Sequence, residues 1–268
     1  MGIVNITPDS FSQDGCLLRN GDYVDHAVNL ALRLIKEGAD MIDLGGESSR
    51  PGAKRISTAE ELRRVIPVLK ILIKKTNIPI SVDTYKPAVA KEALEEGASI
   101  INNIKGTQTS HDLLKMIKRK NAAIILMHTR GSPHSMQKNT HYDNLMEEII
   151  VLLKKSLEKC LEIGIKSDRI VLDPGIGFAK TSEQNLEIIN RLDQLAVLNQ
   201  PILIGTSRKS FIGKILNKPV DQRLLGTIAS VCVSVLNGAH IVRVHDVKET
   251  KEALKVVDAI VNSSIREG

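Results

Sequence analysis

The sequence predicts an α/β fold in which eight parallel strands, each followed by a helix, close into a (β/α)8 TIM barrel. Three observations predict it. Short apolar runs alternate with amphipathic stretches from Gly2 to about residue 263, without a linker or a shift in composition. The runs are almost continuously apolar, which is typical of parallel strands covered on both faces. Closure leaves no strand at an edge, so we expect residues 1–268 to form a single domain.

Local signals place each element. The strands are expected over residues 2–6, 41–44, 78–82, 99–101, 122–127, 169–172, 201–205 and 239–244. The helices are expected from Asp22 to Gly38 and over residues 57–76, 87–96, 111–120, 142–163, 182–197, 222–237 and 248–263. Apolar positions three and four residues apart define them, and Ser57 followed by Glu60 is a typical helix start. An open doubly wound sheet is the alternative, but no GxGxxG motif or P-loop supports it.

Composition narrows the class of partner. The net charge of +6 comes largely from basic runs in helical patterns, such as Lys74 and Lys75, which are typical of solvated faces. Aromatic residues make up 2% of the chain and Trp is absent, so little is available to stack on bases. We therefore expect a small anionic ligand and no nucleic acid.

The cysteines and the hydropathy of the sequence indicate the cellular compartment. Cys16, Cys160 and Cys232 are far apart and show neither a disulfide nor a metal-binding spacing, which favours a reduced compartment. No apolar run approaches the ~18 residues of a membrane span, and no signal peptide is evident. The sequence predicts a cytoplasmic protein without membrane attachment.

Polar side chains stand where seven of the eight expected strands end. In a TIM barrel these ends open onto one mouth, so we expect their side chains to converge on one ligand. A single Asp or Asn at such a place is equally well explained as a helix cap, and the set carries the argument. At the fifth strand His128 is either a ligand contact or a structural histidine, and we favour the second. The set comprises Asn5, the Glu47–Arg50 loop, Asp83, Asn102, Asp173, Lys209, Arg243 and His245.

Two of these strand ends have opposite charge. Asp173 opens the run DPGIGFAK directly after a buried strand, and Lys209 lies in the run TSRKS after the next one. Arg243 and His245 are two residues apart on a strand and so face the same way, which favours anion binding. This arrangement suits a ligand with a hydrogen-bonding head and an anionic tail.

These residues carry a resemblance to a known family. The ordered motifs MGIVNITPDSFS, DLGGESSRPG, SVDT, DPGIGF, GTSRKS and RVHDVKE, from Gly2 to about Glu249, resemble those of the dihydropteroate synthases. The resemblance implies a barrel enzyme of folate biosynthesis that condenses hydroxymethyl-dihydropterin pyrophosphate with p-aminobenzoate. It also implies Mg²⁺, a homodimer and inhibition by sulfonamides.

The resemblance also implies roles for individual residues. The pterin, whose adjacent N–H donors suit carboxylate and amide acceptors, is assigned to Asp83, Asn102, Asp173, Lys209 and Phe178. The pyrophosphate is assigned to Asn5, Ser49, Arg50, Arg243 and His245, with Mg²⁺ at Asn5. The p-aminobenzoate is assigned to Phe11, Pro51, Lys209 and Ser210. Lys209, Asp14 and Arg243 are the expected catalytic residues.

The implied mechanism needs no protein nucleophile, since pyrophosphate leaves first and the aromatic amine attacks a delocalised pterin cation. We expect the glycine-rich loops at Ser10–Gly21 and Glu47–Gly52 to close on p-aminobenzoate only after pyrophosphate and Mg²⁺ have bound. Two alternatives stay open. A pterin-dependent corrinoid methyltransferase shares the barrel but has no use for an anion clamp. A non-catalytic pterin-binding paralogue is suggested by Asn103, which stands where the family has Asp, and by the altered loop around Asp14.

Overall fold

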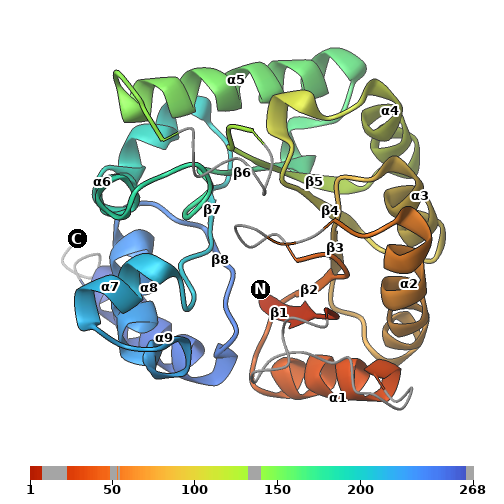
Figure 1. Cartoon of the computed structure of the whole chain (residues 1–268), viewed down its shortest axis with the longest axis horizontal. Coiled ribbons are helices and arrows are strands. Elements are labelled where there is room, and N and C mark those ends of the chain that lie inside the picture. Colours follow the sequence, from red (N-terminus) through yellow and green to blue (C-terminus); the bar gives the residue numbers. More distant parts are fainter. Residues whose placement is uncertain (8–22, 49–52, 54, 132–139, 264–268) are drawn as a thin grey trace.

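The computed structural model describes residues 1–7, 23–48, 53, 55–131 and 140–263. Its strands form an inner ring with helices outside, as Figure 1 shows. The strands are β1 Gly2–Asn5, β2 Ile42–Gly45, β3 Ile80–Asp83, β4 Ile100–Asn103, β5 Ala123–Met127, β6 Ile170–Asp173, β7 Leu203–Ile204 and β8 Ile241–Val242.

The strands pair in parallel and in sequence order. Six of them, β1 to β6, form one sheet, and β7 pairs with β8. Two isolated bridges connect these pieces, Leu172 with Ile202 and Gly2 with Val244. At the second bridge Ile3 N donates to Val244 O at 3.0 Å. The ladder therefore runs around the whole ring, and the barrel prediction is confirmed.

Helices cover the outside of the ring (Figure 1). Ser57 caps α2 by accepting a hydrogen bond from Glu60 N at 3.1 Å, the helix start that the sequence predicts. The α-helices are α1 Tyr23–Lys36, α2 Thr58–Lys75, α3 Pro87–Glu95, α4 His111–Lys120, α5 Leu145–Ile163, α6 Ser182–Asn190, α7 Ser210–Leu216, α8 Leu224–Leu236 and α9 Val247–Ser263. Short 3₁₀ turns are η2 Gly106–Gln108, η4 Ser167–Arg169, η5 Leu192–Leu198 and η6 Val220–Gln222.

The prediction of one helix over residues 182–197 is wrong. α6 ends at Asn190, and the 3₁₀ segment η5 follows it. The buried residues of η5 are Leu192, Leu195 and Leu198, whose spacing of three matches the 3.0-residue turn of a 3₁₀-helix. Packing against the barrel therefore favours the tighter turn there.

The sequence also missed the short helix α7, whose seven residues begin at Ser210. Seven residues are too few to show a helical period, and Asn217, in the left-handed conformation at φ +51°, ends the helix. The helix expected over 142–163 begins later, at Leu145, because Asn144 caps it by accepting from Glu147 N.

Apolar side chains close the lower part of the barrel. Met1, Ile125 and Leu203 are buried together inside the ring, and Met41, Ile100, Val171 and Ile241 pack against them. The larger core cluster contains residues of both the strands and the helices, such as Val4, Leu44 and Leu69. With the floor filled, the C-terminal strand ends are left for polar side chains and a ligand.

Candidate active site

Strand register places the polar strand ends in one row. Asn5 pairs with Gly45, Gly45 with Asp83, and Asp83 with Asn102. Residues in register on neighbouring parallel strands point to the same side of the sheet. A side chain on Gly45 would lie 3.4 Å from Asn5 Oδ1, so glycine leaves room between Asn5 and Asp83.

A cavity of about 400 Å³ opens above this row. Strand ends from around the ring contribute to it, together with the loops that follow them. The structure brings together on its wall every predicted site residue that it describes. These residues are Asn5, Asp83, Asn102, Asp173, Phe178, Lys209, Ser210, Arg243 and His245.

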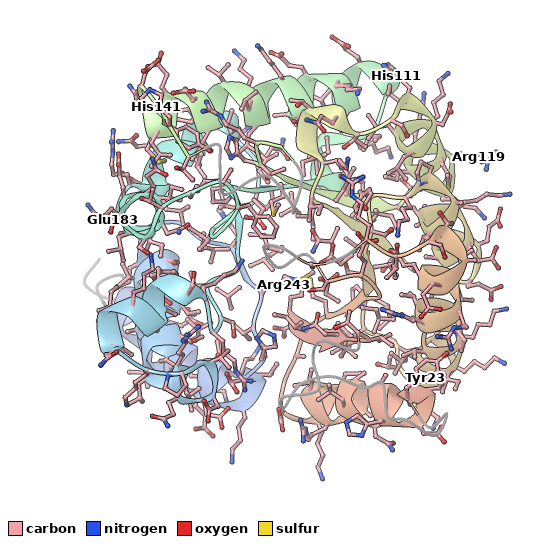
Figure 2. All side chains as sticks on the ribbon, in the orientation of Figure 1. Tyr23, His111, Arg119, His141, Glu183 and Arg243 are labelled. Atoms are coloured by element: carbon pink, nitrogen blue, oxygen red, sulfur yellow. The ribbon has the colours of Figure 1, made fainter. Side chains whose placement is uncertain are left out.

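Asp43, a buried carboxylate that the sequence analysis did not single out, organises the centre of the site. It lies two residues before Gly45 on β2 and is fully buried. Arg243 Nε donates to Asp43 Oδ2 at 2.6 Å, and Asn102 Nδ2 donates to the same oxygen at 3.1 Å. Figure 2 shows Arg243 near the middle of the ring. One carboxylate thus orients both a predicted pterin ligand and a predicted pyrophosphate ligand.

Arg243 also contacts Asp83, since its Nη2 donates to Asp83 Oδ2 at 3.2 Å. One guanidinium therefore lies between two carboxylates. Burial, opposed by Arg243 and reinforced by Asp43, raises the pKa of Asp83 to about 7. Asp83 is accordingly poised to change charge near neutral pH, where an added N–H donor would favour its ionised form.

The loop after β6 presents an acid and an aromatic ring. Asp173 Oδ1 accepts a hydrogen bond from Gly175 N at 2.7 Å, and burial raises the pKa of the Asp173 carboxyl. The Phe178 ring lies 4.6 Å from the Lys209 ammonium, which also donates to Ile176 O at 2.7 Å. A flat ligand could thus meet an acceptor, a hydrophobic ring and a cation at one place.

The loop after β7 is fixed to the end of β8. Ser207 Oγ lies 2.9 Å from His245 Nδ1. Arg208, which has a left-handed φ of +57°, pairs with Asp246 at 2.6 Å. Such a backbone conformation is unfavourable for a residue with a side chain and persists where its surroundings hold it. These contacts fix the backbone directly before Lys209, and so fix where its side chain enters the cavity.

A charged cluster holds the loop after β2. Lys86 Nζ bonds to Glu47, donates to Ile56 O at 2.8 Å, and pairs with the buried Glu61 at 2.6 Å. Tyr85 donates to the other oxygen of Glu47 at 2.9 Å. Because Glu47 and Ile56 flank the loop that carries Ser49 to Pro51, one ammonium ties both of its ends.

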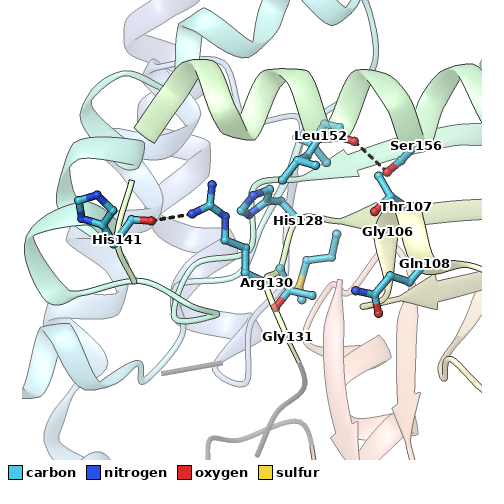
Figure 3. A pocket seen from close by; sticks show the side chains of 12 residues that line it. Gly106, Thr107, Gln108, His128, Arg130, Gly131, His141, Leu152 and Ser156 are labelled. Atoms are coloured by element: carbon cyan, nitrogen blue, oxygen red, sulfur yellow. Dashed lines mark hydrogen bonds between the residues drawn. The ribbon is translucent and has the colours of Figure 1, made fainter. Parts of the chain in front are cut away.

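A second cavity, of about 450 Å³, lies between η2, the end of β5 and α5. Figure 3 shows that Arg130 on its wall donates to His141 O, and Ser156 to Leu152 O. Arg130 also pairs with Glu148. None of the described residues predicted to bind the ligand lines this cavity. The site is therefore assigned to the cavity at the strand ends, although that cavity is slightly smaller.

The sequence of this chain is similar to those of known pterin-binding enzymes. Residues 1–245 match the family described as pterin binding enzyme. Over 262 residues the chain is 46% identical to the dihydropteroate synthase of Clostridium beijerinckii, covering 97% of this chain and 93% of that protein. The chain belongs to the dihydropteroate synthase family. The resemblance predicted from the motifs is confirmed.

Solved structures of the family have the same fold. The Yersinia pestis dihydropteroate synthase, in complex with a sulfonamide drug, matches with a TM-score of 0.92 and 42% identity, over 98% of this chain and 94% of that chain. The Xanthomonas albilineans dihydropteroate synthase, with 4-aminobenzoic acid, matches with a TM-score of 0.89 and 39% identity, over 97% and 92%. The likeness spans nearly the whole barrel, including the strand ends that form the site.

Five of the family residues predicted from the sequence lie outside the described residues, and their roles stay predictions. They are Phe11, Asp14, Ser49, Arg50 and Pro51. Asn103, which the motif resemblance sets against an Asp, is described: it is fully buried, and its Oδ1 accepts from Lys105 N at 2.7 Å. It supports the turn after β4 and is not among the residues that line the cavity.

His128 is buried, and its Nδ1 lies 3.0 Å from Lys180 Nζ. This contact agrees with the structural role that we favoured.

Within the described residues, no helix has the length and apolar character that crossing a bilayer requires.

Proposed function

We propose that this member of the dihydropteroate synthase family condenses hydroxymethyl-dihydropterin pyrophosphate with p-aminobenzoate, giving dihydropteroate and pyrophosphate in folate biosynthesis. The observation that carries the proposal is the polarity of the cavity. Asp83, Asn102 and Asp173 supply acceptors from three strand ends, and Lys209 and Arg243 supply cations from two others. A pterin with an anionic tail has the complementary pattern.

The carboxylates of the pterin half have two tasks. Asp83 and Asp173 accept hydrogen bonds from the N–H edge of the pterin, and Lys209 donates to its acceptor side. When pyrophosphate departs, positive charge develops on the pterin. Carboxylates already fixed in a buried site stabilise such charge without having to reorganise. No side chain has to act as a nucleophile.

The part of the cavity near Arg243 and His245 binds the pyrophosphate leaving group. Arg243 and His245 lie on the wall of the same cavity and supply donors to an oxyanion. Asp43 orients Arg243 through the 2.6 Å contact with its Nε. The guanidinium is therefore positioned before the substrate arrives, which reduces the entropy lost on binding.

Mg²⁺ is the proposed cofactor, with Asn5 Oδ1 as its protein ligand. Within the described part of the chain, no cluster of three His, Cys, Asp or Glu side chains could hold a metal. Mg²⁺ commonly keeps several waters and takes one or two protein oxygens together with substrate phosphates, so a single amide oxygen beside an anion subsite fits its chemistry. Bound there, the ion would neutralise part of the pyrophosphate charge.

The p-aminobenzoate subsite is proposed beside Lys209, Ser210 and Phe178. Ser210 is exposed on the cavity wall at the start of α7, and Phe178 offers an apolar face. The Xanthomonas relative was solved with 4-aminobenzoic acid and the Yersinia relative with a sulfonamide drug, and both complexes support this part of the proposal. Sulfonamides are expected to bind at the same subsite.

A homodimer is proposed through α8 and α9. The small polar residues Thr227 and Ser234 of α8 face the barrel, whereas Leu225 is 74% and Leu236 59% exposed. Ile260 on the neighbouring α9 is 65% exposed. An apolar surface of this kind is typical of an interface, and a second copy of the chain supplies a matching one. We further propose a cytoplasmic location, where widely separated cysteines stay reduced.

The test is to mix the pterin pyrophosphate, p-aminobenzoate and Mg²⁺ with the protein, and to measure pyrophosphate and dihydropteroate together. Equal amounts of the two products are expected. Pterin binding without either product would indicate a non-catalytic paralogue. Methyl transfer from a methylated pterin to a corrinoid, without pyrophosphate release, would indicate the methyltransferase class.

A further inference from the structure

The loop that follows β6, Pro174–Ala179, is held from two sides by lysines that contact its carbonyl oxygens. On the buried side, Lys180 Nζ donates to Gly175 O at 3.0 Å and to Phe178 O at 2.9 Å. On the cavity side, Lys209 Nζ donates to a third carbonyl oxygen of the loop at 2.7 Å. Lys209 already has a place in the proposed reaction, whereas Lys180 has none.

Lys180 is buried, with 3% of its surface exposed. Its third contact is His128 Nδ1 at 3.0 Å. Burial lowers the pKa of His128 well below its ordinary value, so the ring is neutral and Nδ1 can accept. An ammonium has three N–H donors, and these match the three acceptors one to one. Burial lowers the pKa of Lys180 to about 7, so the amine is charged below neutral pH. Burying that charge costs free energy that an apolar side chain would not, which indicates a role beyond filling space.

The backbone of this loop depends on its surroundings. Gly175, Gly177 and Ala179 have φ angles of +72°, +80° and +52°. Ala179 carries a Cβ, which makes this conformation unfavourable unless other contacts maintain it. A Cβ on Gly175 would lie 2.0 Å from His128 O, so the loop packs directly on the end of β5. The donors of Lys180 are among the contacts that keep the chain on this path.

The two loop residues that Lys180 contacts are linked to two predicted pterin ligands. Gly175 N donates to Asp173 Oδ1 at 2.7 Å. Phe178, whose carbonyl oxygen binds Lys180, places its ring 4.6 Å from the Lys209 ammonium. A displacement of either carbonyl would therefore turn the carboxylate or the ring away from the cavity.

We propose that Lys180 is a positioning residue for the pterin half of the site, which fixes the Asp173 carboxylate and the Phe178 ring through the backbone between them. This inference rests on the proposed function. Lys180 touches neither substrate. It acts on binding of the pterin and leaves the anion subsite, which other strands build, unaffected.

The test is Lys180→Met, which keeps the length of the side chain and removes its charge and donors. Isothermal titration calorimetry is run with hydroxymethyl-dihydropterin, and separately with pyrophosphate and Mg²⁺. The Kd for the pterin alcohol should rise about tenfold or more, while that for pyrophosphate changes less than about twofold. Equal weakening of both ligands would indicate general loosening of the barrel and overturn the inference. Unchanged pterin affinity would also overturn it.

A matched control and a measurement on the unaltered protein complete the test. Lys166 is exposed, and Lys166→Met should change neither Kd. In the unaltered protein, pterin alcohol should slow hydrogen exchange of the peptide covering residues 173–180 at least about threefold, and pyrophosphate should not. Absence of this protection would contradict the inference even if Lys180→Met did not fold. If the unaltered protein binds no pterin, the proposed function fails instead.

Discussion

The charge state of Asp83 should make pterin binding depend on pH. Its pKa, raised to about 7 mainly by burial, gives an ionised fraction of about 1% at pH 5 and about 90% at pH 8. If the pterin N–H groups require the carboxylate, the apparent affinity for the pterin is proportional to the ionised fraction of Asp83. The affinity should therefore rise on the order of 50–100-fold from pH 5 to pH 8. The rise should level off above pH 8.

The same carboxyl affects stability with the opposite sign. The pKa in the folded state lies above the ordinary value of 3.8, so the folded protein binds a proton more readily than the unfolded chain. This contribution to the free energy of unfolding is fully present below pH 3.8 and is lost as the pH rises through about 7. Asp83→Asn should reduce the pH dependence of both the pterin affinity and the free energy of unfolding between these pH values.

Calorimetric titration of hydroxymethyl-dihydropterin at pH 5, 6, 7 and 8 measures the effect. Burial also lowers the pKa of Lys180 to about 7. Asp83→Asn leaves this group in place, so the difference between the two slopes isolates Asp83. The exposed Asp168 provides a matched control, since Asp168→Asn should keep the slope of the unaltered protein. The reasoning is refuted if Asp83→Asn binds the pterin alcohol with the same pH slope as the unaltered protein.

Other substitutions probe the two halves of the site and the surface. Asp173→Asn should weaken pterin binding by about 2–3 kcal/mol in calorimetry without lowering Tm, because a buried acid becomes neutral; unchanged affinity would exclude Asp173 as a ligand. Arg243→Ala should weaken pyrophosphate far more than pterin alcohol, and equal losses would make Arg243 structural. Leu225→Glu should yield monomers in analytical ultracentrifugation, whereas Leu161→Glu, on α5, should not; a monomeric unaltered protein would contradict the proposed interface.

Much of the site was predictable because a barrel brings its strand ends together. Asn5, Asp83, Asn102 and Asp173 each end an apolar run in the sequence, and all four line one cavity. Asp43 was missed because it lies within a strand, where a charged residue is not expected. The signal was available, since Asp43 is two residues before Gly45 and therefore faces the same side of the strand.

Other features depend on contacts that sequence patterns do not encode. The position of Lys180 beneath its loop follows from the left-handed turns at Gly175 and Gly177, which the glycines permit but do not require. The end of α6 was missed because a spacing of three and four was expected where Leu192 and Leu195 follow a strict spacing of three. Local periods of this kind are decided by packing against the barrel.

The central claim is that one cavity holds a pterin subsite and an anion subsite side by side, built from different strand ends. Competition calorimetry with the intact pterin pyrophosphate tests this most directly. Hydroxymethyl-dihydropterin alone and pyrophosphate with Mg²⁺ alone should each displace the intact substrate, and each should still bind when the other is saturating. If the two halves exclude one another, or if neither displaces the intact substrate, the account is contradicted.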